Sequence, residues 1–513
     1  MRRSNGGIIG PDNVTTGGFS GVASGVFKLG EVTDLIRESK WPEVSPFINT
    51  IPNSVRLDGG GTYFSRTQTA GNRRTWTQSG WYKFDGIDPG NAQSLVSTNG
   101  TNTGTNFHYT LEKGGSSGGA SDTLSCHGYS GDIFQTTRLL RDYSGWYHIV
   151  LAVDTTQGTS ANRMKLYVNG ESVTMSEQAQ YPAQNFEFGV NNNNIVIGLG
   201  THPGSVSGYQ FSGYMANIEL VDGLAYGPEY FGSTNADSGI WTPVPTSTIS
   251  SYGTNGFKLA FANASALGTD TSGQSNNFTA NSITSIDQGS DSPSNNFATA
   301  NPIGSQRIGG GSIRPTVYSE ANLTILLGSG GYYTRATSTI AVSTGRWYWE
   351  TKMISNCDSG SDPTIGIIGT GGNQNEQTGT SPNSSMQYRY NGQKGYNNVG
   401  NASYGATWTN GDIIGIALDL TSATKTITFY KNNVSQGVAF SGNGTSDGFD
   451  PANEYWSPFW VAGGSTNATM SLNMGNPPYA LSSAVADANG FGQFEYAPPT
   501  GYFSLCTNNL NVI

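Results

Sequence analysis

The residues that could perform acid–base chemistry in this chain of 513 residues are few and widely spaced. Retaining hydrolysis of a glycosidic bond needs two carboxylates about 5 Å apart, which on a strand means two residues on one face, two or four positions apart. No Glu-x-Asp-x-x-Glu pattern occurs in the two regions that we predict to be β-sandwiches. Glu31, Asp34 and Glu38 have helical spacing instead, which is typical of a solvated helix face.

Nucleophilic and thiolate chemistry is equally unsupported. None of the histidines accompanies a Ser or Cys in a nucleophile motif; they are His108, His127, His148 and His202. The three cysteines are too far apart for a CxxC metal pair and odd in number, which favours buried free thiols; they are Cys126, Cys357 and Cys506. The glycine run 309–311 lacks the strand, Lys and helix of a phosphate loop. We therefore expect a protein that is not an enzyme.

Calcium is the one cofactor for which the sequence offers candidate ligands, in the form of clustered side-chain oxygens. The stretch 270–276 places Asp270, Asn276 and several hydroxyl or amide groups in one short loop, and Asp222 and Glu229 flank a glycine-containing turn. Neither has EF-hand spacing, and Asx turns explain both segments at least as well. We therefore name no metal ligands.

Aromatic side chains in loop-rich sequence are the strongest binding candidates. Sugars present an apolar C–H face and many hydroxyls, so an aromatic platform ringed by Asn, Asp and backbone donors suits them. The candidates are Tyr332, Tyr333, Tyr388, Tyr390, Tyr404 and Trp408. The alternative is that Tyr388, Tyr390 and Trp408 are strand residues of a core.

The composition predicts the elements that must position these groups. Gly and Pro together make up 92 residues (71 and 21), aromatics make up 11%, and charged residues only 12%. Abundant turn formers and aromatics with few long helix formers indicate many short strands, and so a mostly β protein.

Two regions show the same succession of strands. In residues 46–232, strands are predicted at 54–57, 75–84, 146–154, 195–198 and 211–221, and Asn169-Gly170 predicts a type I′ hairpin. In residues 303–480, strands are predicted at 345–350, 411–421 and 426–433. Ala152-Val-Asp-Thr-Thr156 and Ala417-Leu-Asp-Leu-Thr421 each precede a turn and another strand. We predict two related jelly-roll sandwiches in series.

Three further segments flank or join them. Residues 1–45 contain Leu29, Val32, Leu35 and Ile36 on one face of a short predicted helix, which must dock on its own chain or on a partner to be stable. Residues 233–302 are predicted to be a structured connector. Residues 481–513 are predicted to be a tail that packs on the second sandwich.

Charge and hydropathy exclude several classes of partner. The net charge is −10, Lys258 is the only Lys or Arg between Leu166 and Gln306, and none follows Lys431. Nucleic-acid binding needs clustered basic residues, so we expect no nucleic-acid partner. No apolar run reaches the roughly 18 residues of a membrane span, and the N-terminus lacks an export signal. We expect no membrane insertion.

Particular motifs resemble known families. The stretch 54–231 resembles a laminin G-type, concanavalin A-like domain, in Thr75-Trp-Thr-Gln-Ser-Gly-Trp-Tyr-Lys83 and Gly213-Tyr-Met-Ala-Asn-Ile218. The stretch 345–474 resembles a SPRY domain, in Arg346-Trp-Tyr-Trp-Glu350 and Gly411-Asp-Ile-Ile-Gly-Ile-Ala-Leu-Asp419. The series, with Asn295-Asn-Phe-Ala-Thr-Ala-Asn-Pro302 and Pro498-Pro-Thr-Gly-Tyr-Phe-Ser-Leu-Cys-Thr507, resembles structural proteins of tailed phages, often marine ones.

That resemblance implies a virion component assembled in the host cytoplasm and exposed on the particle. It favours a tail fibre that adheres to a host surface glycan or protein, is commonly a trimer, and is attached to other virion proteins through residues 1–45. A capsid-surface fibre or a connector without receptor binding is the alternative, and a polysaccharide depolymerase is a lesser one. SPRY loops form ligand surfaces, which is what the resemblance implies for the tyrosines and Trp408.

Overall fold

The structure is a computed structural model of the whole chain. It describes residues 7–9, 26–28, 51–86, 92–99, 109–114, 122–128, 131–175, 181–200, 209–236, 238–245, 249–303, 306–308, 316–328, 333–369, 385–396, 399–443, 449 and 455–510.

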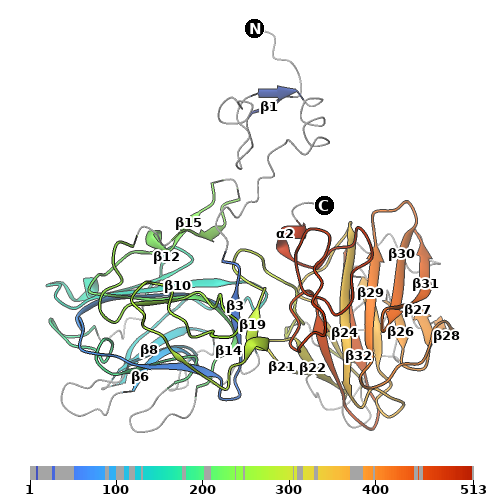
Figure 1. Ribbon diagram of the computed structural model, residues 1–513, viewed down its shortest axis with the longest axis horizontal. Helices are drawn as coiled ribbons and strands as arrows, with labels where there is room; N and C mark the ends of the chain where they lie inside the picture. The colour runs from blue at the N-terminus through green and yellow to red at the C-terminus, as the bar shows by residue number, and fades with distance from the viewer. Residues whose placement is uncertain are drawn as a thin grey trace.

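Two β-sandwiches lie side by side, as Figure 1 shows in blue to green for the first and in yellow to red for the second. Each consists of two antiparallel sheets around its own apolar core. The prediction of a mostly β chain with two sandwiches in series is therefore confirmed. Apolar side chains on the inner faces of the longer strands fill the space between the two sheets of each sandwich.

The first sandwich joins a sheet of eight strands to one of seven. The first sheet has the order β12-β11-β10-β5-β14-β3-β19, with β17 also pairing with β14; its strands are Glu171–Ser172, Met164–Val168, Tyr147–Asp154, Thr75–Phe84, Ser212–Asp222, Ser54–Asp58, Gln288–Gly289 and Phe257–Leu259. The second has the order β18-β4-β13-β6-β7-β8-β9; its strands are Thr279–Asn281, Tyr63–Thr67, Asn194–Ile197, Gln93–Asn99, Tyr109–Lys113, Leu124–Gly128 and Gly131–Gln135.

The second sandwich has seven strands in each sheet. One sheet has the order β20-β23-β32-β25-β26-β27-β28; its strands are Gln306–Ile308, Tyr333–Thr337, Trp456–Ala462, Thr364–Gly369, Ser385–Arg389, Gln393–Tyr396 and Val399–Ser403. The other has the order β21-β22-β33-β24-β29-β30-β31; its strands are Val317–Ser319, Thr324–Leu327, Ala468–Asn473, Arg346–Ser355, Ile413–Asp419, Lys425–Lys431 and Val434–Gly442.

Short elements complete the described chain. Two small antiparallel pairs stand outside the sandwiches; they are β1 with β2 (Gly7–Ile9 and Val26–Lys28) and β15 with β16 (Gly232–Thr234 and Trp241–Pro243). Helical turns are η1, η2, η4 and α2, at Ser160–Asn162, Pro228–Tyr230, Ser285–Asp287 and Thr507–Leu510. The predicted docking residues Leu29, Val32, Leu35 and Ile36 lie outside the described residues.

Matching hairpins join corresponding strands of the two sandwiches. Asn169 and Gly170 have φ values of 51° and 79° between β11 and β12, as the predicted type I′ turn requires. Asn432 and Asn433 have φ values of 47° and 68° between β30 and β31. Asparagine tolerates this left-handed conformation better than most residues do, so the second turn forms without glycine.

Residues 233–302 are more than the connector that the sequence predicts. Within this stretch β17 pairs with β14, β18 with β4, and β19 with β3. Strands of two to three residues are too short to show a periodic pattern of their own, which is why the sequence predicts only a structured connector here. The segment therefore completes both sheets of the first sandwich.

The C-terminal residues pack on the second sandwich through a buried carboxylate. Glu350 on β24 accepts hydrogen bonds from the backbone N–H groups of Glu495 and Tyr496, both 2.9 Å long, and from the side chain of Asn473. Phe494 meets the ring of Tyr348 edge to face, with centroids 5.3 Å apart. Burial raises the pKa of Glu350 to about 7.

Buried charges hold the junction between the sandwiches. Arg56 on β3 is 2% exposed and contacts Glu320 at 2.9 Å and the carbonyl of Pro477 at 3.3 Å, both in the second half of the chain. The hydroxyl of Tyr214 accepts a hydrogen bond from Asn476. Because a buried guanidinium needs charged or polar partners, these contacts link the first sandwich to the second half of the chain.

A second buried ion pair lies where residues 290–297 run along the junction. Lys83 on β5 and Asp291 are 2% and 0% exposed, and Lys83 Nζ lies 2.7 Å from Asp291 Oδ2. The other oxygen of Asp291 accepts a hydrogen bond from Trp146 Nε1 at 3.0 Å. Lys83 Nζ also donates to the side-chain oxygen of Asn296 at 2.7 Å.

Candidate functional site

The structure places most of the predicted ligand-binding aromatics in the second core. Tyr388 and Trp408 are 0% and 2% exposed, which corrects the expectation that they form a platform for a ligand. Tyr390 and Tyr404 are partly buried against the same core. Tyr332 lies outside the described residues.

Three of these side chains do lie together, with Tyr388 at the centre of a cluster that includes the core residue Phe429. The rings of Tyr404 and Phe429 lie 5.3 Å and 5.2 Å from the ring of Tyr388, and Trp408 lies 6.1 Å from it. The hydroxyl of Tyr388 donates to the carbonyl of Ala406. Edge-to-face aromatic packing of this kind stabilises a core, so these residues position strands.

Tyr333 is also partly accessible, and it packs on a separate small cluster of the second sandwich. Its hydroxyl donates to Asp362 Oδ2 at 2.8 Å, and Arg389 Nη2 lies 2.7 Å from both oxygens of Asp362. Burial and the neighbouring carboxylate raise the pKa of Tyr333 to about 12. The phenol thus stays protonated and can only donate or accept hydrogen bonds.

Of the two carboxylates considered for calcium, Asp270 forms an Asx turn with Ser272, whereas Asp222 accepts its hydrogen bonds from residues distant in the sequence. Asp270 accepts hydrogen bonds from the N–H groups of Lys258, Ser272 and Asn276, and from the hydroxyl of Ser272. Asp222 accepts bonds from Asn72, Asn191 and Asn255. A cation would meet these donors in place of free lone pairs, so the alternative without metal is favoured. No group of three or more His, Cys, Asp or Glu gathers among the described residues.

A serine–histidine pair in the first sandwich has the wrong protonation for nucleophilic catalysis. His148 Nε2 lies 2.9 Å from Ser79 Oγ, and His148 Nδ1 lies 3.0 Å from Trp241 Nε1, which can only donate. The proton of the imidazole is therefore on Nε2 and is donated to Ser79. Burial lowers the pKa of His148 to about 3, so the ring is neutral and cannot accept the proton of Ser79 at this atom.

The three cysteines are buried and are not joined to one another by disulfides. Cys126, Cys357 and Cys506 are free and buried, as the sequence predicts. Burial raises the pKa of Cys357 to about 12, which keeps its thiol unreactive.

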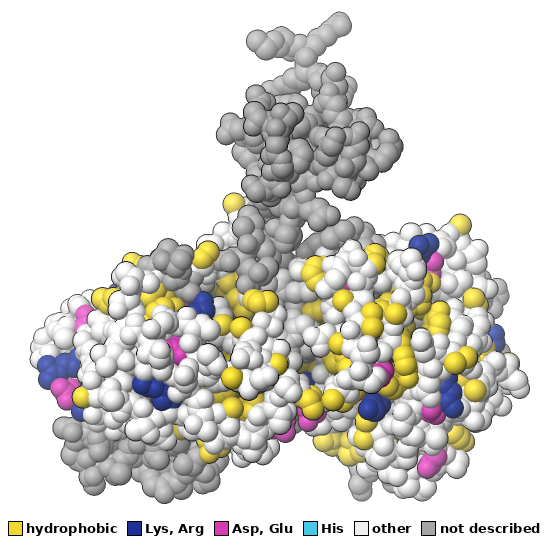
Figure 2. Space-filling model, viewed as in Figure 1, with side chains coloured by type: hydrophobic (Ala, Val, Ile, Leu, Met, Phe, Trp, Pro, Cys, Tyr) yellow, Lys and Arg dark blue, Asp and Glu magenta, His cyan; other side chains and the backbone are white. Residues whose placement is uncertain are grey.

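Within the part of the chain that is described, no helix has the length and apolarity to cross a membrane. Figure 2 shows charged side chains scattered over the visible face of both sandwiches, without a basic cluster.

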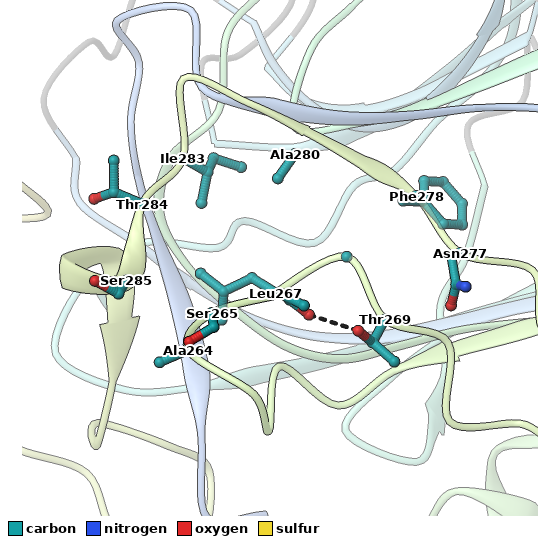
Figure 3. Close-up of a pocket in the computed structure, with 12 residues that line it drawn as sticks. Ala264, Ser265, Leu267, Thr269, Asn277, Phe278, Ala280, Ile283, Thr284 and Ser285 are labelled. Carbon is teal, nitrogen blue, oxygen red and sulfur yellow. Dashed lines mark hydrogen bonds between the residues drawn. The ribbon is translucent and has the colours of Figure 1, made fainter.

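A pocket of about 560 Å³ lies on the first sandwich, and the sequence did not indicate it. Residues 264–269 form one wall and residues 277–285 the other, as Figure 3 shows. Leu267 and Phe278 line it and are nearly buried, at 4% and 7% exposure. Strand β18 forms part of the second wall, and the η4 turn closes one end.

The lining of the pocket is neutral. Besides Leu267, Phe278 and Ile283, it consists of small, hydroxyl or amide side chains and includes no charged residue; the polar members are Ser265, Thr269, Asn277, Thr284 and Ser285. Thr269 is held by a hydrogen bond to the carbonyl of Ala266, drawn in Figure 3, and Thr284 by the capping box with Asp287. Such a surface can bind a ligand with hydroxyls and an apolar face, but offers no acid or base.

Comparison with known proteins identifies both sandwiches. Residues 58–224 match the model of the concanavalin A-like lectin/glucanases superfamily, and residues 346–453 match the SPRY domain model. The chain carries a concanavalin A-like domain followed by a SPRY domain. Domains of these two kinds suggest a binding function. The pocket belongs to the concanavalin A-like unit but uses residues after the matched range, which is why motifs of that family could not indicate it.

Solved structures give weaker likenesses. The SPRY domain of human HERC1 is 19% identical with a TM-score of 0.26, over 34% of this chain and 96% of that chain. A candidate carbohydrate-binding protein from Bacteroides ovatus is 19% identical with a TM-score of 0.32, over 46% and 60%. A SAP-like pentraxin from Limulus polyphemus is 18% identical with a TM-score of 0.26, over 35% and 79%.

Proposed function

We propose that this chain is a virion-surface protein of a tailed phage that binds a host-surface glycan without catalysis, as part of a tail fibre. The observation that carries the binding function is the series of a concanavalin A-like and a SPRY domain. The neutral pocket at 264–285 supports a glycan ligand, because its apolar wall and hydroxyl rim match the two kinds of surface that a sugar presents.

The assignment to a phage particle rests on the sequence resemblance of the whole series. Its further parts are attachment to other virion proteins through residues 1–45, assembly in the host cytoplasm and a trimeric fibre. The acidic balance of the chain, with a net charge of −10, disfavours binding to nucleic acid.

Binding of the purified, fluorescently labelled chain to intact candidate host cells and to an array of neutral and acidic glycans tests the function. Saturable binding to infected hosts, without release of reducing sugar from their polysaccharides, supports a non-catalytic adhesin. Absence of binding to every host that the particle infects favours a capsid-surface fibre or connector, and released reducing sugar favours a depolymerase.

A substitution that fills the pocket tests whether the glycan binds there or elsewhere on the surface. Ala280 lines the pocket, and Ala280→Trp is expected to lower glycan binding at least tenfold. Ala262 is exposed just before the pocket wall 264–269 and does not line the pocket, so Ala262→Trp is the matched control. Equal binding by both variants would show that the glycan binds elsewhere.

A further inference from the structure

A lysine, an asparagine and an aspartate meet at one point of the junction between the sandwiches. Lys83 Nζ lies 2.7 Å from Asp291 Oδ2, 2.7 Å from Asn296 Oδ1 and 3.0 Å from the carbonyl oxygen of Phe297. Lys83 and Asp291 are among the most buried charged side chains of the described residues, with exposures of 2% and 0%. The ring of Tyr214 lies 5.8 Å from Nζ.

The carboxamide of Asn296 is held with its carbonyl towards the lysine. Its Nδ2 donates to the backbone carbonyl of Ser144 at 2.8 Å, and its backbone N–H donates to the hydroxyl of Thr507 at 3.0 Å. Since a C=O bond is about 1.2 Å long, Nζ lies at most about 3.9 Å from the carbonyl carbon of Asn296. This is close to the separation at which an amine can attack a carbonyl.

The aspartate supplies the proton transfers that such an attack needs. A lysine is a nucleophile only as the neutral amine, so the attack requires that Asp291 first take a proton from Lys83. Burial raises the pKa of Asp291, in keeping with this proton position. The hydrogen bond from Trp146 to Oδ1 leaves Oδ2 facing Lys83.

We propose that Lys83 and Asn296 react to form an intramolecular isopeptide bond, with Asp291 as the proton shuttle. Asp291 takes a proton from the Lys83 ammonium, and the neutral Nζ attacks the carbonyl carbon of Asn296. Asp291 then moves a proton from Nζ to Nδ2, the bond from carbon to Nδ2 breaks, and ammonia leaves. One C–N bond forms and one breaks, so the step needs no oxidant, reductant or cofactor.

The bond would join a central strand of one sheet of the first sandwich to the segment that leads into the second sandwich. Residues 83 and 296 are 213 positions apart, and β5 lies between β10 and β14 in its sheet. A buried ion pair with the same contacts but no reaction is the competing structure. It differs from the isopeptide in covalent mass, which makes the two distinguishable.

Intact-mass spectrometry of the purified full chain under denaturing conditions tests the bond. We expect a mass below that of the sequence by one ammonia, and after proteolysis a branched peptide that joins Lys83 to Asn296. A mass equal to that of the sequence, with the two residues in separate peptides, would overturn the proposal. A loss of one water, with Lys83 joined to Asp291, would overturn it as well.

Variants locate the chemistry. Asn296→Ala and Lys83→Arg are expected to restore the full mass of their own sequences, and Asp291→Asn to do so while both reacting side chains remain. Lys113 provides the matched control, because it lies 3.0 Å from Asp122 in another buried lysine–aspartate pair. Lys113→Arg must keep the ammonia loss; if it abolishes the loss, or if Asn296→Ala retains it, the assignment to Lys83 and Asn296 is wrong.

Discussion

The carboxyl group that holds the C-terminal residues makes stability depend on pH in a defined direction. Burial raises the pKa of Glu350 from 4.5 to about 7 in the folded chain, although four hydrogen-bond donors, including Tyr348 and Asn473, partly offset the cost of burial. The folded state therefore binds a proton that the unfolded state has already released between these two pH values. It follows that stability from this group is fully present below about pH 4.5 and is lost as pH rises through about 7.

The magnitude follows from the size of the shift. A change of about 2.5 pH units, at 1.36 kcal/mol per unit, corresponds to about 3 kcal/mol of unfolding free energy. Denaturant unfolding at a series of pH values between about 5 and about 8 measures it, with Glu350→Gln as the reference that cannot titrate. The wild-type free energy should fall relative to that of Glu350→Gln as pH rises.

Parallel curves for the two proteins over this range would refute the reasoning, because they would show that Glu350 titrates alike in both states. A wild-type unfolding free energy that rises with pH relative to that of Glu350→Gln would show that folding lowers the pKa of Glu350. The hydrogen bonds from Glu495 and Tyr496 would then outweigh burial.

Two further predictions concern residues that the sequence placed at a binding surface or a metal site. Trp408→Ala should lower the unfolding free energy by about 3–5 kcal/mol, while Ala at its exposed neighbour Thr407 leaves it unchanged; an unaltered melting temperature for Trp408→Ala would mean that the indole is at the surface. Removal of calcium by a chelator should leave the melting temperature unchanged, because protein donors already occupy the carboxylates of Asp222 and Asp270; a clear drop would show that a cation contributes at one of them.

Much of the fold could be predicted because strands and turns leave local signals. The strands 75–84 and 147–154 combine β-branched and aromatic residues, and Asn169-Gly170 marks the turn that its φ values require. The site was harder to predict. Alternation along β26 decides whether Tyr388 faces the core or the solvent, and loop-rich neighbours gave no information on that face.

Contacts that arise only when the chain folds left no signal in the sequence. The pocket arises because residues 264–269 and 277–285 fold against each other, and neither segment has a motif. Lys83 and Asp291 are 208 positions apart, so nothing in the surroundings of either residue predicts that they meet. Burial and long-range pairing are properties of the folded topology, which local periodicity does not encode.

The charged junction also limits how such a chain can recombine. Arg56 belongs to the first sandwich and Glu320 to the second half of the chain, and Tyr214 and Asn476 make a similar cross-contact. A hybrid that exchanged the whole second sandwich for an unrelated one would remove Glu320 and leave buried Arg56 with Asp287 as its remaining carboxylate partner. An exchange of the second sandwich alone is therefore expected to lose the partners of both Arg56 and Tyr214 that lie in the second half of the chain.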